Sequence, residues 1–305
     1  MTLREPVEIV DVAPRDGFQA ISTWIPTETK TRTVHNLLAA GLRRVEVGAF
    51  VSPKAIPQMA DTAEVHLAVE REAGVRLSTL VPNQQGAENA FGAGVTDLVY
   101  VLSVSESHNQ SNVRRPTQAS LDELQQVIVR GRDQAGFKLR ANIATAFDCP
   151  YEGRIEIDAV SRIIEPIAMA GIPIEFGICD TTGRAFPDQV AALFEHCLEK
   201  FASPELNWCF HGHDTYGLGI ANALYAYEAG VRVFDAAAAG LGGCPFAPGA
   251  SGNTATEDLV FTFHNMGIDT GIDLEKLMDA ATEVATISGA DTGGHVRQLP
   301  RVRIV

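Results

Sequence analysis

Short apolar runs recur along the chain, and longer stretches with helical periodicity separate them. Eight runs, rich in Val, Ile, Leu and Phe, have the length and composition of buried β-strands. They cover residues 7–12, 44–47, 77–81, 98–102, 139–143, 174–178, 206–210 and 233–236. Strands that alternate with helices run parallel, and eight strand–helix units predict an α/β fold of the (β/α)8 TIM-barrel type. An open doubly wound sheet is disfavoured, because no Gly-x-Gly-x-x-Gly pattern follows the first strand.

The dipeptide Ala-Gly punctuates this alternation. It ends a helical stretch and precedes a strand-like run at residues 40–41, 73–74, 93–94, 135–136, 170–171 and 229–230. Glycine suits the left-handed conformation that follows many helices, so we expect six helix ends at these positions. One helix start is predicted by Ser120 and Glu123, which form a capping-box pattern around the helical repeat Leu121, Leu124 and Ile128.

The chain continues beyond the eighth unit. Residues 273–289 have the pattern of one further helix, which gives the barrel a short C-terminal helical extension. We therefore expect residues 1–289 to form the barrel with this additional helix. The tail, residues 290–305, is polar and then contains Pro and several Arg, and it could cap the domain, contact another subunit or be disordered.

Composition narrows the class of partner. The 305 residues are 46% hydrophobic and 20% charged, as expected for a globular enzyme. The formal charge of −14 argues against nucleic acid and against anionic membranes, both of which need a basic surface. A small anionic ligand is still compatible, because a few local arginines can bind one.

The cysteines and the amino terminus indicate the compartment. The five cysteines (Cys149, Cys179, Cys197, Cys209 and Cys244) are scattered and lack a C-x-x-C spacing. A disulfide framework or zinc knuckle is therefore not expected, and a reducing cytoplasm is the default location. The sequence has no signal-peptide pattern and no run of about 20 apolar residues that could span a membrane.

Two histidines close the seventh run. His211 and His213 follow residues 206–210, and side chains two residues apart on a strand point to the same face. Two imidazoles presented in this way suit a divalent metal ion, although a lone His-x-His is as often a structural pair bonded to the backbone. Asp16, after the first strand, would add a carboxylate ligand to the two imidazoles. Such a metal ion would keep coordination positions open for substrate or water. Completion by the amide oxygen of Asn253 favours Mg²⁺ or Mn²⁺ over structural zinc.

Active sites of such barrels lie at the carboxyl ends of the strands. The polar residues expected there are Arg15, Asp16 and Gln19 after the first strand, Glu46 on the second, Asp180 and Thr181 after the sixth, and Cys244 after the eighth. Some have ordinary alternatives. Arg15 could be a salt-bridge partner of Asp11 or Glu46, Asp180 could cap the turn that follows it, and Cys244 could be an inert buried side chain.

Longer stretches of the sequence resemble the 3-hydroxy-3-methylglutaryl-CoA lyase family, part of a larger group of metal-dependent barrel enzymes that make or break carbon–carbon bonds. The resemblance extends from about residue 7 to about residue 290. The matching stretches are PRDG (14–17), FVSPK (50–54), PQMAD (57–61), CPYEG (149–153), HGHDTYG (211–217), GLGGCP (240–245), GASGN (249–253) and ATEDL (255–259). Each fragment alone is weak, and their combination is specific.

The resemblance implies a lyase that cleaves a 3-hydroxy-3-methylglutaryl-CoA-like thioester to acetyl-CoA and a keto acid, with Mg²⁺ or Mn²⁺ as cofactor. It implies that Asp16, His211 and His213 bind the metal, with Asn253 as a further ligand. By analogy with the family, the protein is expected to be a homodimer whose small-molecule partner is an acyl-CoA.

The resemblance also implies catalytic roles. Arg15 would stabilise the enolate of the departing acetyl-CoA, Cys244 would be the catalytic thiol of a loop, and Glu46 would be a supporting acid. The proton of the C3 hydroxyl could be taken by Asp16 or by His213, and the sequence does not separate these two.

Departures from the family pattern fall near the expected substrate. They are Phe18 in place of Leu, Ala49 in place of a small hydroxyl residue, Asp148 in place of Gly, the stretch 179–183 (CDTTG) in place of Gly-Asp-Thr-Ile-Gly, and Arg184 after that turn. The residues expected to contact substrate are Arg15, Gln19, Asp148, Asp180 and Thr181. We hypothesise that the chemistry is kept while the substrate is another 3-hydroxy-3-substituted dicarboxyl-CoA, of citramalyl type or with a longer branch.

Four other functions remain open, and one of them is a related aldolase that releases a free aldehyde or ketone. A synthase of the same group would condense acetyl-CoA with a 2-oxo acid, but such enzymes usually carry a long regulatory region, and this sequence ends at Val305. Metal-dependent barrel hydrolases also use His-x-His, normally on the first strand rather than the seventh. A non-catalytic acyl-CoA-binding protein would be expected to lose Arg15 or Cys244, and both are present.

Overall fold

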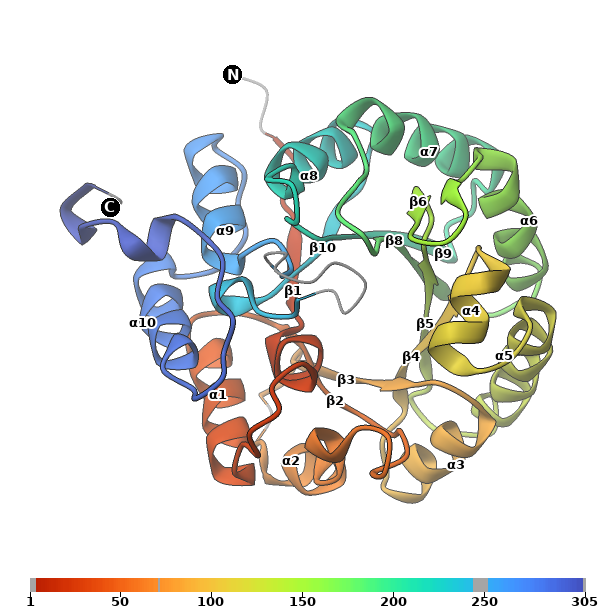
Figure 1. The fold of residues 1–305 in the computed structure, drawn as a ribbon, viewed down its shortest axis with the longest axis horizontal. Coiled ribbons are helices and arrows are strands. Elements are labelled where there is room, and N and C mark those ends of the chain that lie inside the picture. Colours follow the sequence, from red (N-terminus) through yellow and green to blue (C-terminus); the bar gives the residue numbers. More distant parts are fainter. Residues whose placement is uncertain (1–3, 71, 244–251, 304–305) are drawn as a thin grey trace.

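The computed structural model describes residues 4–70, 72–243 and 252–303. Within these residues eight parallel strands close into a barrel, in the order β1-β2-β3-β4-β5-β8-β9-β10 and back to β1 (Figure 1). The strands are β1 (Glu8–Asp11), β2 (Arg44–Ala49), β3 (Arg76–Val81), β4 (Asp97–Ser103), β5 (Lys138–Ala144), β8 (Ile174–Asp180), β9 (Leu206–Gly212) and β10 (Val233–Ala236). The predicted (β/α)8 barrel is confirmed, and each predicted strand-like run overlaps one of these strands.

Helices surround the barrel (Figure 1). They are α1 (Thr27–Ala39), α2 (Thr62–Ala68), α3 (Gln84–Gly92), α4 (Glu106–Val113), α5 (Thr117–Gly131), α6 (Ile157–Ala168), α7 (Pro187–Lys200), α8 (Gly219–Glu228), α9 (Thr256–Asn265) and α10 (Leu274–Ala285). The sequence pattern did not separate α4 from α5. It also did not indicate the antiparallel pair β6 (Asp148–Cys149) and β7 (Gly153–Arg154), which follows β5 in the chain.

Helices end at the Ala-Gly pairs 40–41, 93–94 and 229–230 and within two residues of the pair 170–171, as predicted. The ends predicted at 73–74 and 135–136 are wrong, because α2 ends at Ala68 and α5 at Gly131, and the predicted start of α5 is wrong as well. All six Ala-Gly glycines have φ between 67° and 112°, the left-handed conformation expected after a helix. Helix α5 begins at Thr117, so Ser120 lies inside the helix rather than at its cap. The backbone N–H of Thr117 donates instead to the carboxylate of Glu106 on α4, at 2.9 Å. A cap supplied by a neighbouring helix therefore replaces the local one.

The segments that meet at the carboxyl ends of β1 and β10 are joined by one carboxylate. Asp11, the last residue of β1, is fully buried and accepts hydrogen bonds from the backbone N–H of Ala13 and Ala238 and from the hydroxyl of Thr256. These bonds connect β1, the segment after β10 and the first residue of α9. They fix the backbone of the barrel next to the region where Asp16 and Asn253 lie.

The final segment packs beside α9 and α10 (Figure 1). Helix α10 is capped by Asp273, whose side chain accepts from the N–H groups of Glu275 and Lys276. Further on, Asp258 of α9 accepts from the backbone N–H of His295 and Val296. In the part of the chain that the structure describes, no helix is long and apolar enough to cross a membrane.

Candidate active site

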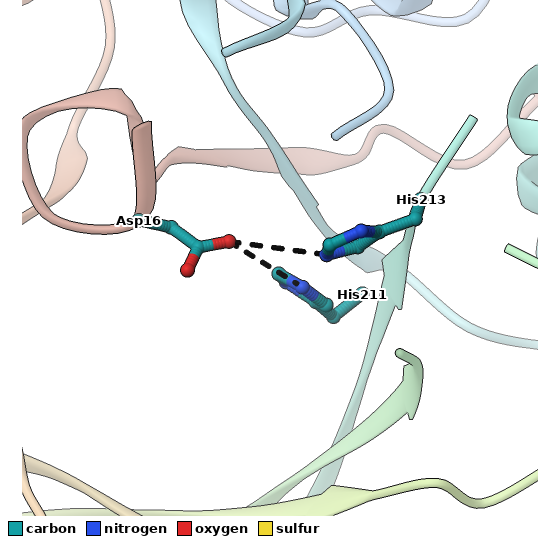
Figure 2. A group of neighbouring side chains, drawn as sticks. All are labelled: Asp16, His211 and His213. Carbon is teal, nitrogen blue, oxygen red and sulfur yellow. Dashed lines mark ion pairs between the residues drawn. The ribbon is translucent and has the colours of Figure 1, made fainter. Parts of the chain in front are cut away.

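A carboxylate and two imidazoles face one another at the carboxyl end of the barrel strands (Figure 2). The Oδ2 atom of Asp16 lies 4.0 Å from Nε2 of His211 and 3.9 Å from Nε2 of His213. Both separations are too long for a hydrogen bond. Atoms that bind one cation at about 2.1 Å are themselves roughly 3–4 Å apart, so the spacing fits a shared divalent ion. The sequence predicted this grouping from residues almost 200 positions apart.

Local backbone structure explains how these side chains converge. His211 lies on β9 and His213 just beyond its end, so the alternation of the strand sends both rings to the same side. Asp16 lies on a π-helical turn, Ala13–Gly17, which begins directly after β1. Such turns are rare and occur frequently at functional sites. The backbone N–H of Asp16 donates to the carbonyl of Val12 at 2.7 Å, and this bond holds Asp16 close to the end of β1.

The other nitrogen of His211 is already engaged. Its Nδ1 lies 3.2 Å from Oδ2 of Asp235, a carboxylate on β10. A carboxylate in this position fixes the ring and leaves the Nε2 lone pair for a metal. Burial alone lowers the pKa of His211, but the hydrogen bond to Asp235 and its charge outweigh burial and raise that pKa above its usual value.

The charges within the cluster suit a cation. Burial raises the pKa of Asp16, but the charges of Arg15, His211 and His213 outweigh burial and lower it to about 2. Burial, together with the charge of His211, lowers the pKa of His213 to about 4. Asp16 is therefore ionised and His213 neutral at pH 7, as metal binding requires.

Asn253 lies next to this cluster, as expected. A bridge between the backbones of His213 and Asn253 brings the two residues side by side. The Nδ2 atom of Asn253 donates to Oδ2 of Asp16 at 2.8 Å and to the carbonyl of Leu241 at 2.9 Å. Its Oδ1 atom is buried and has no hydrogen-bond partner among the described residues. A buried amide oxygen without a partner is unusual, and a cation would satisfy it.

Arg15 is held between two carboxylates. It is 6% exposed, and its guanidinium donates through Nε to Glu46 and through Nη1 to Asp16. Burial lowers the pKa of Arg15, but Asp16 and Glu46 outweigh that effect and keep the group charged. The salt-bridge alternative with Glu46 is thus correct, and Arg15 also lines a cavity.

A cavity of about 750 Å³ opens beside these groups. Its wall includes Arg15, Asp16, His211 and His213, together with two more predicted substrate contacts, Gln19 and Thr181. The wall also contains residues that the sequence did not single out: Trp24, His108, Asn112, Asn142 and Asp291. For His108 and Asn112 a local signal existed in Ser105. Its side chain accepts from the N–H of His108 and so caps α4, the helix that carries both residues to the rim of the cavity.

Two predicted substrate contacts do not line the cavity, and one predicted catalytic residue lies outside the described residues. The carboxylate of Asp180 accepts from the backbone N–H of Arg184 and Ala185, so it caps the turn after β8, and it does not line the cavity. Asp148, which also does not line the cavity, lies 3.7 Å from the guanidinium of Arg184. Cys244 lies outside the described residues, although Gly242 and Gly243 before it line the cavity.

Taken together, the fold and the site define a class: (β/α)8 proteins with a carboxylate and two imidazoles, spaced to suit a divalent metal, at the carboxyl ends of their strands. Residues 6–284 match the model of the HMGL-like family. The chain belongs to this family, which confirms the resemblance drawn from the sequence motifs.

Relatives with similar sequences cover nearly the whole chain. A hydroxymethylglutaryl-CoA lyase of Bacillus subtilis (strain 168) is 42% identical over 281 residues, which are 92% of this chain and 93% of that protein. An (R)-citramalyl-CoA lyase of Chloroflexus aurantiacus is 40% identical over 295 residues, 93% of this chain and 92% of that protein.

A solved structure is also similar. The HMG-CoA lyase of Acinetobacter baumannii, determined in complex with coenzyme A and 3-methylmalate, has a TM-score of 0.88 and 40% identity, and the match covers 95% of this chain and 94% of that one.

Proposed function

We propose that this protein is a divalent-metal-dependent carbon–carbon lyase. Its substrate would be a 3-hydroxy-3-methylglutaryl-CoA-like thioester, and its products acetyl-CoA and a keto acid. The observation that carries the proposal is the convergence of Arg15, Asp16, His211 and His213 on one wall of a cavity in a chain of the HMGL-like family. The lyase activities of the relatives favour cleavage over condensation, hydrolysis or simple acyl-CoA binding.

Asp16, His211, His213 and Asn253 are the residues that would hold the cation. A bound Mg²⁺ or Mn²⁺ would act as a Lewis acid that makes the C3 hydroxyl of the substrate more acidic. Two observations support this ligand set: among the described residues the buried Oδ1 atom of Asn253 has no hydrogen-bond partner, and the Nε2 atoms of both histidines lie within 4.0 Å of Oδ2 of Asp16. Metal identity would be tested by restoring chelated protein with each ion separately.

Cleavage then requires two proton movements and one bond break. The C3 hydroxyl loses its proton, the C2–C3 bond breaks, C3 becomes a ketone carbon, and the electron pair passes into a thioester enolate. Asp16 and His213 are the two candidate proton acceptors. Arg15, kept charged and oriented by Glu46, would offset the negative charge that develops on the thioester oxygen. Cys244 would return a proton to C2, as the resemblance implies.

The preferred acyl group has two candidates. The relatives include hydroxymethylglutaryl-CoA lyases and an (R)-citramalyl-CoA lyase at nearly equal identity, so overall similarity does not separate the two substrates. Initial rates of acetyl-CoA release from both thioesters, and from a longer-branched analogue, would decide. Chelator should abolish the activity. If no 3-hydroxyacyl-CoA releases acetyl-CoA in the presence of Mg²⁺ or Mn²⁺, the proposed function is wrong.

We also expect a homodimer, by analogy with the family. The mass of the protein in solution, measured by light scattering, would test this expectation.

A further inference from the structure

The interior of the barrel contains a chain of charged side chains that reaches the candidate metal site. Interiors of (β/α)8 barrels are ordinarily filled by branched apolar residues. Here Arg44 and Arg140, each 2% exposed, are among the largest fully buried side chains. Burying ions is costly unless each is paired with good geometry, so the arrangement requires an explanation.

The contacts form a continuous path. Arg44 on β2 donates to Glu8 of β1 at 2.9 Å and to Glu175 of β8 at 2.7 Å. Glu175 also accepts from Nε of Arg140 on β5. The other end of Arg140 donates through Nη1 to Oδ1 of Asp235, at 2.6 Å.

The path ends on the predicted metal ligand. Arg140 donates to Oδ1 of Asp235, whereas the other oxygen, Oδ2, lies 3.2 Å from Nδ1 of His211. The two oxygens of Asp235 therefore have separate tasks. Oδ1 is held by the guanidinium of Arg140, while Oδ2 orients the imidazole of His211.

We propose that Arg140 is a positioning residue for the metal site: it fixes Asp235, and Asp235 fixes the ring of His211. This inference rests on the proposed metal-dependent function. Without Arg140, the hydrogen bonds of the buried Asp235 carboxylate among the described residues would be those to His211 and to the thiol of Cys209, at 3.2 Å each. It could then rotate, and Nε2 of His211 would no longer be held toward Asp16.

Gly177 makes room for this side chain. A Cβ atom at Gly177 on β8 would lie 3.5 Å from Cδ of Arg140 and 2.1 Å from the amide oxygen of Asn142. The glycine thus lets two long polar residues of β5 extend across the inside of the barrel. Arg140 can for this reason reach Asp235 on β10, although β8 and β9 separate their strands.

Arg44 provides a matched control. It is the same residue type, equally buried, and shares Glu175 with Arg140, but none of its hydrogen bonds or ion pairs in the structure goes to Asp235. In Arg140→Met, Glu175 keeps Arg44 and Asp235 loses its cation. In Arg44→Met, Glu175 keeps Arg140 and Glu8 loses its cation. The two variants remove the same charge from the same interior and differ in whether Asp235 is affected.

The test is Mn²⁺ binding to the purified protein, followed by the electron paramagnetic resonance signal of free Mn²⁺. Outer partners of metal ligands typically contribute about 10–100-fold to metal affinity. We therefore expect Kd to rise by about tenfold or more in Arg140→Met and to stay within about twofold of the wild type in Arg44→Met. An equal rise in both variants would overturn the proposal, because it would indicate general loosening of the barrel.

A second comparison asks whether Arg140 acts through Asp235. If it does, Arg140→Met should add little to the loss of Mn²⁺ affinity in Asp235→Asn, since coupled residues are not additive. Additive losses in the double variant would refute the proposed path. If the methionine variants do not fold, as judged by circular dichroism, Arg140→Lys and Arg44→Lys replace them. A lysine keeps the charge but cannot bridge two carboxylates as a guanidinium does, so Arg140→Lys alone should weaken Mn²⁺ binding.

Failure of the inference and failure of the proposed function are distinguishable. A wild-type protein that binds no Mn²⁺ would remove the metal site itself, and this inference with it. A wild type that binds Mn²⁺, with arginine variants that lose affinity equally, would leave the proposed function standing and reject only the role of Arg140.

Discussion

Replacing Arg15 with Met removes the guanidinium between Glu46 and Asp16 while keeping an unbranched side chain. The proposed role of Arg15 is to offset the charge that develops on the thioester oxygen as the carbon–carbon bond breaks. Removing one donor aimed at developing charge lowers kcat by about 10²–10³-fold, or roughly 2.7–4 kcal/mol. We expect a loss of this size in Arg15→Met.

The structure also predicts an effect on stability. Glu46 is fully buried, and Arg15 donates to its carboxylate. Breaking one half of a buried ion pair costs about 3–5 kcal/mol, so activity could fall because the protein unfolds. The double variant Arg15→Met/Glu46→Gln separates the two causes, since a neutral glutamine leaves no buried charge. It should recover much of the lost Tm and remain about 10²–10³-fold slower than the wild type.

The assay is the initial rate of acetyl-CoA release at saturating thioester and metal, with Tm and Mn²⁺ affinity measured on the same samples. The Mn²⁺ affinity of both variants should not fall, because Arg15 is a cation next to the cation site. A folded single or double variant that keeps kcat within about threefold of the wild type would refute the electrostatic role of Arg15.

Three further predictions follow from the site and from the interior of the barrel. Saturating Mn²⁺, at about 100 times its Kd, should raise the free energy of unfolding by about 2.7 kcal/mol and increase Tm by several degrees, an increase that Asp16→Asn should largely abolish. The pKa of Glu175 is lowered from 4.5 to about 2, since the charges of Arg140 and Arg44 outweigh its burial. A lowered carboxyl pKa adds stability above the unfolded-state pKa and loses it as pH falls through the folded-state value, so roughly 3 kcal/mol should disappear between about pH 4.5 and 2. The free energy of unfolding of Glu175→Gln, measured with denaturant, should fall less steeply with decreasing pH across that range than that of the wild type. An unchanged pH dependence would contradict this assignment. Finally, Asp148→Asn should leave thioester preference unchanged, because Asp148 contacts Arg184 rather than the cavity; a shift in the ratio of kcat/KM values between two thioesters would restore Asp148 as a substrate contact.

The barrel could be predicted from sequence because its signals are local. Each strand is a short apolar run, and the left-handed glycines of the Ala-Gly pairs, such as Gly41 and Gly230, end helices regardless of what packs against them. The approach of Asp16 to His211 and His213 followed from the rule that parallel strands of a barrel place their carboxyl ends together. The alternation of side chains along a strand predicted that His211 and His213 point to the same side.

Other features depend on contacts between distant segments, which no local pattern encodes. Helix α5 starts at Thr117 because Glu106 of another helix caps it, so the capping pattern at Ser120 was misleading. Arg140 and Asp235 each lie in a run that looks like an ordinary strand, and their pairing depends on the closure of the barrel. Trp24 and Asp291 line the cavity from segments outside helices and strands. The position of such segments depends on tertiary packing, so no local pattern predicted these two residues.

The hydrogen bond between Asp16 and Asn253 joins residues 237 positions apart. A ribosome that adds about 5–20 residues per second needs roughly 10–50 s to synthesise that interval. Asp16 is made first, His211 and His213 follow almost 200 residues later, and Asn253 is made last of the four. The proposed set of four ligands therefore cannot be complete before residue 253 of the 305 has been made, so a metal ion could be held by all four only late in synthesis.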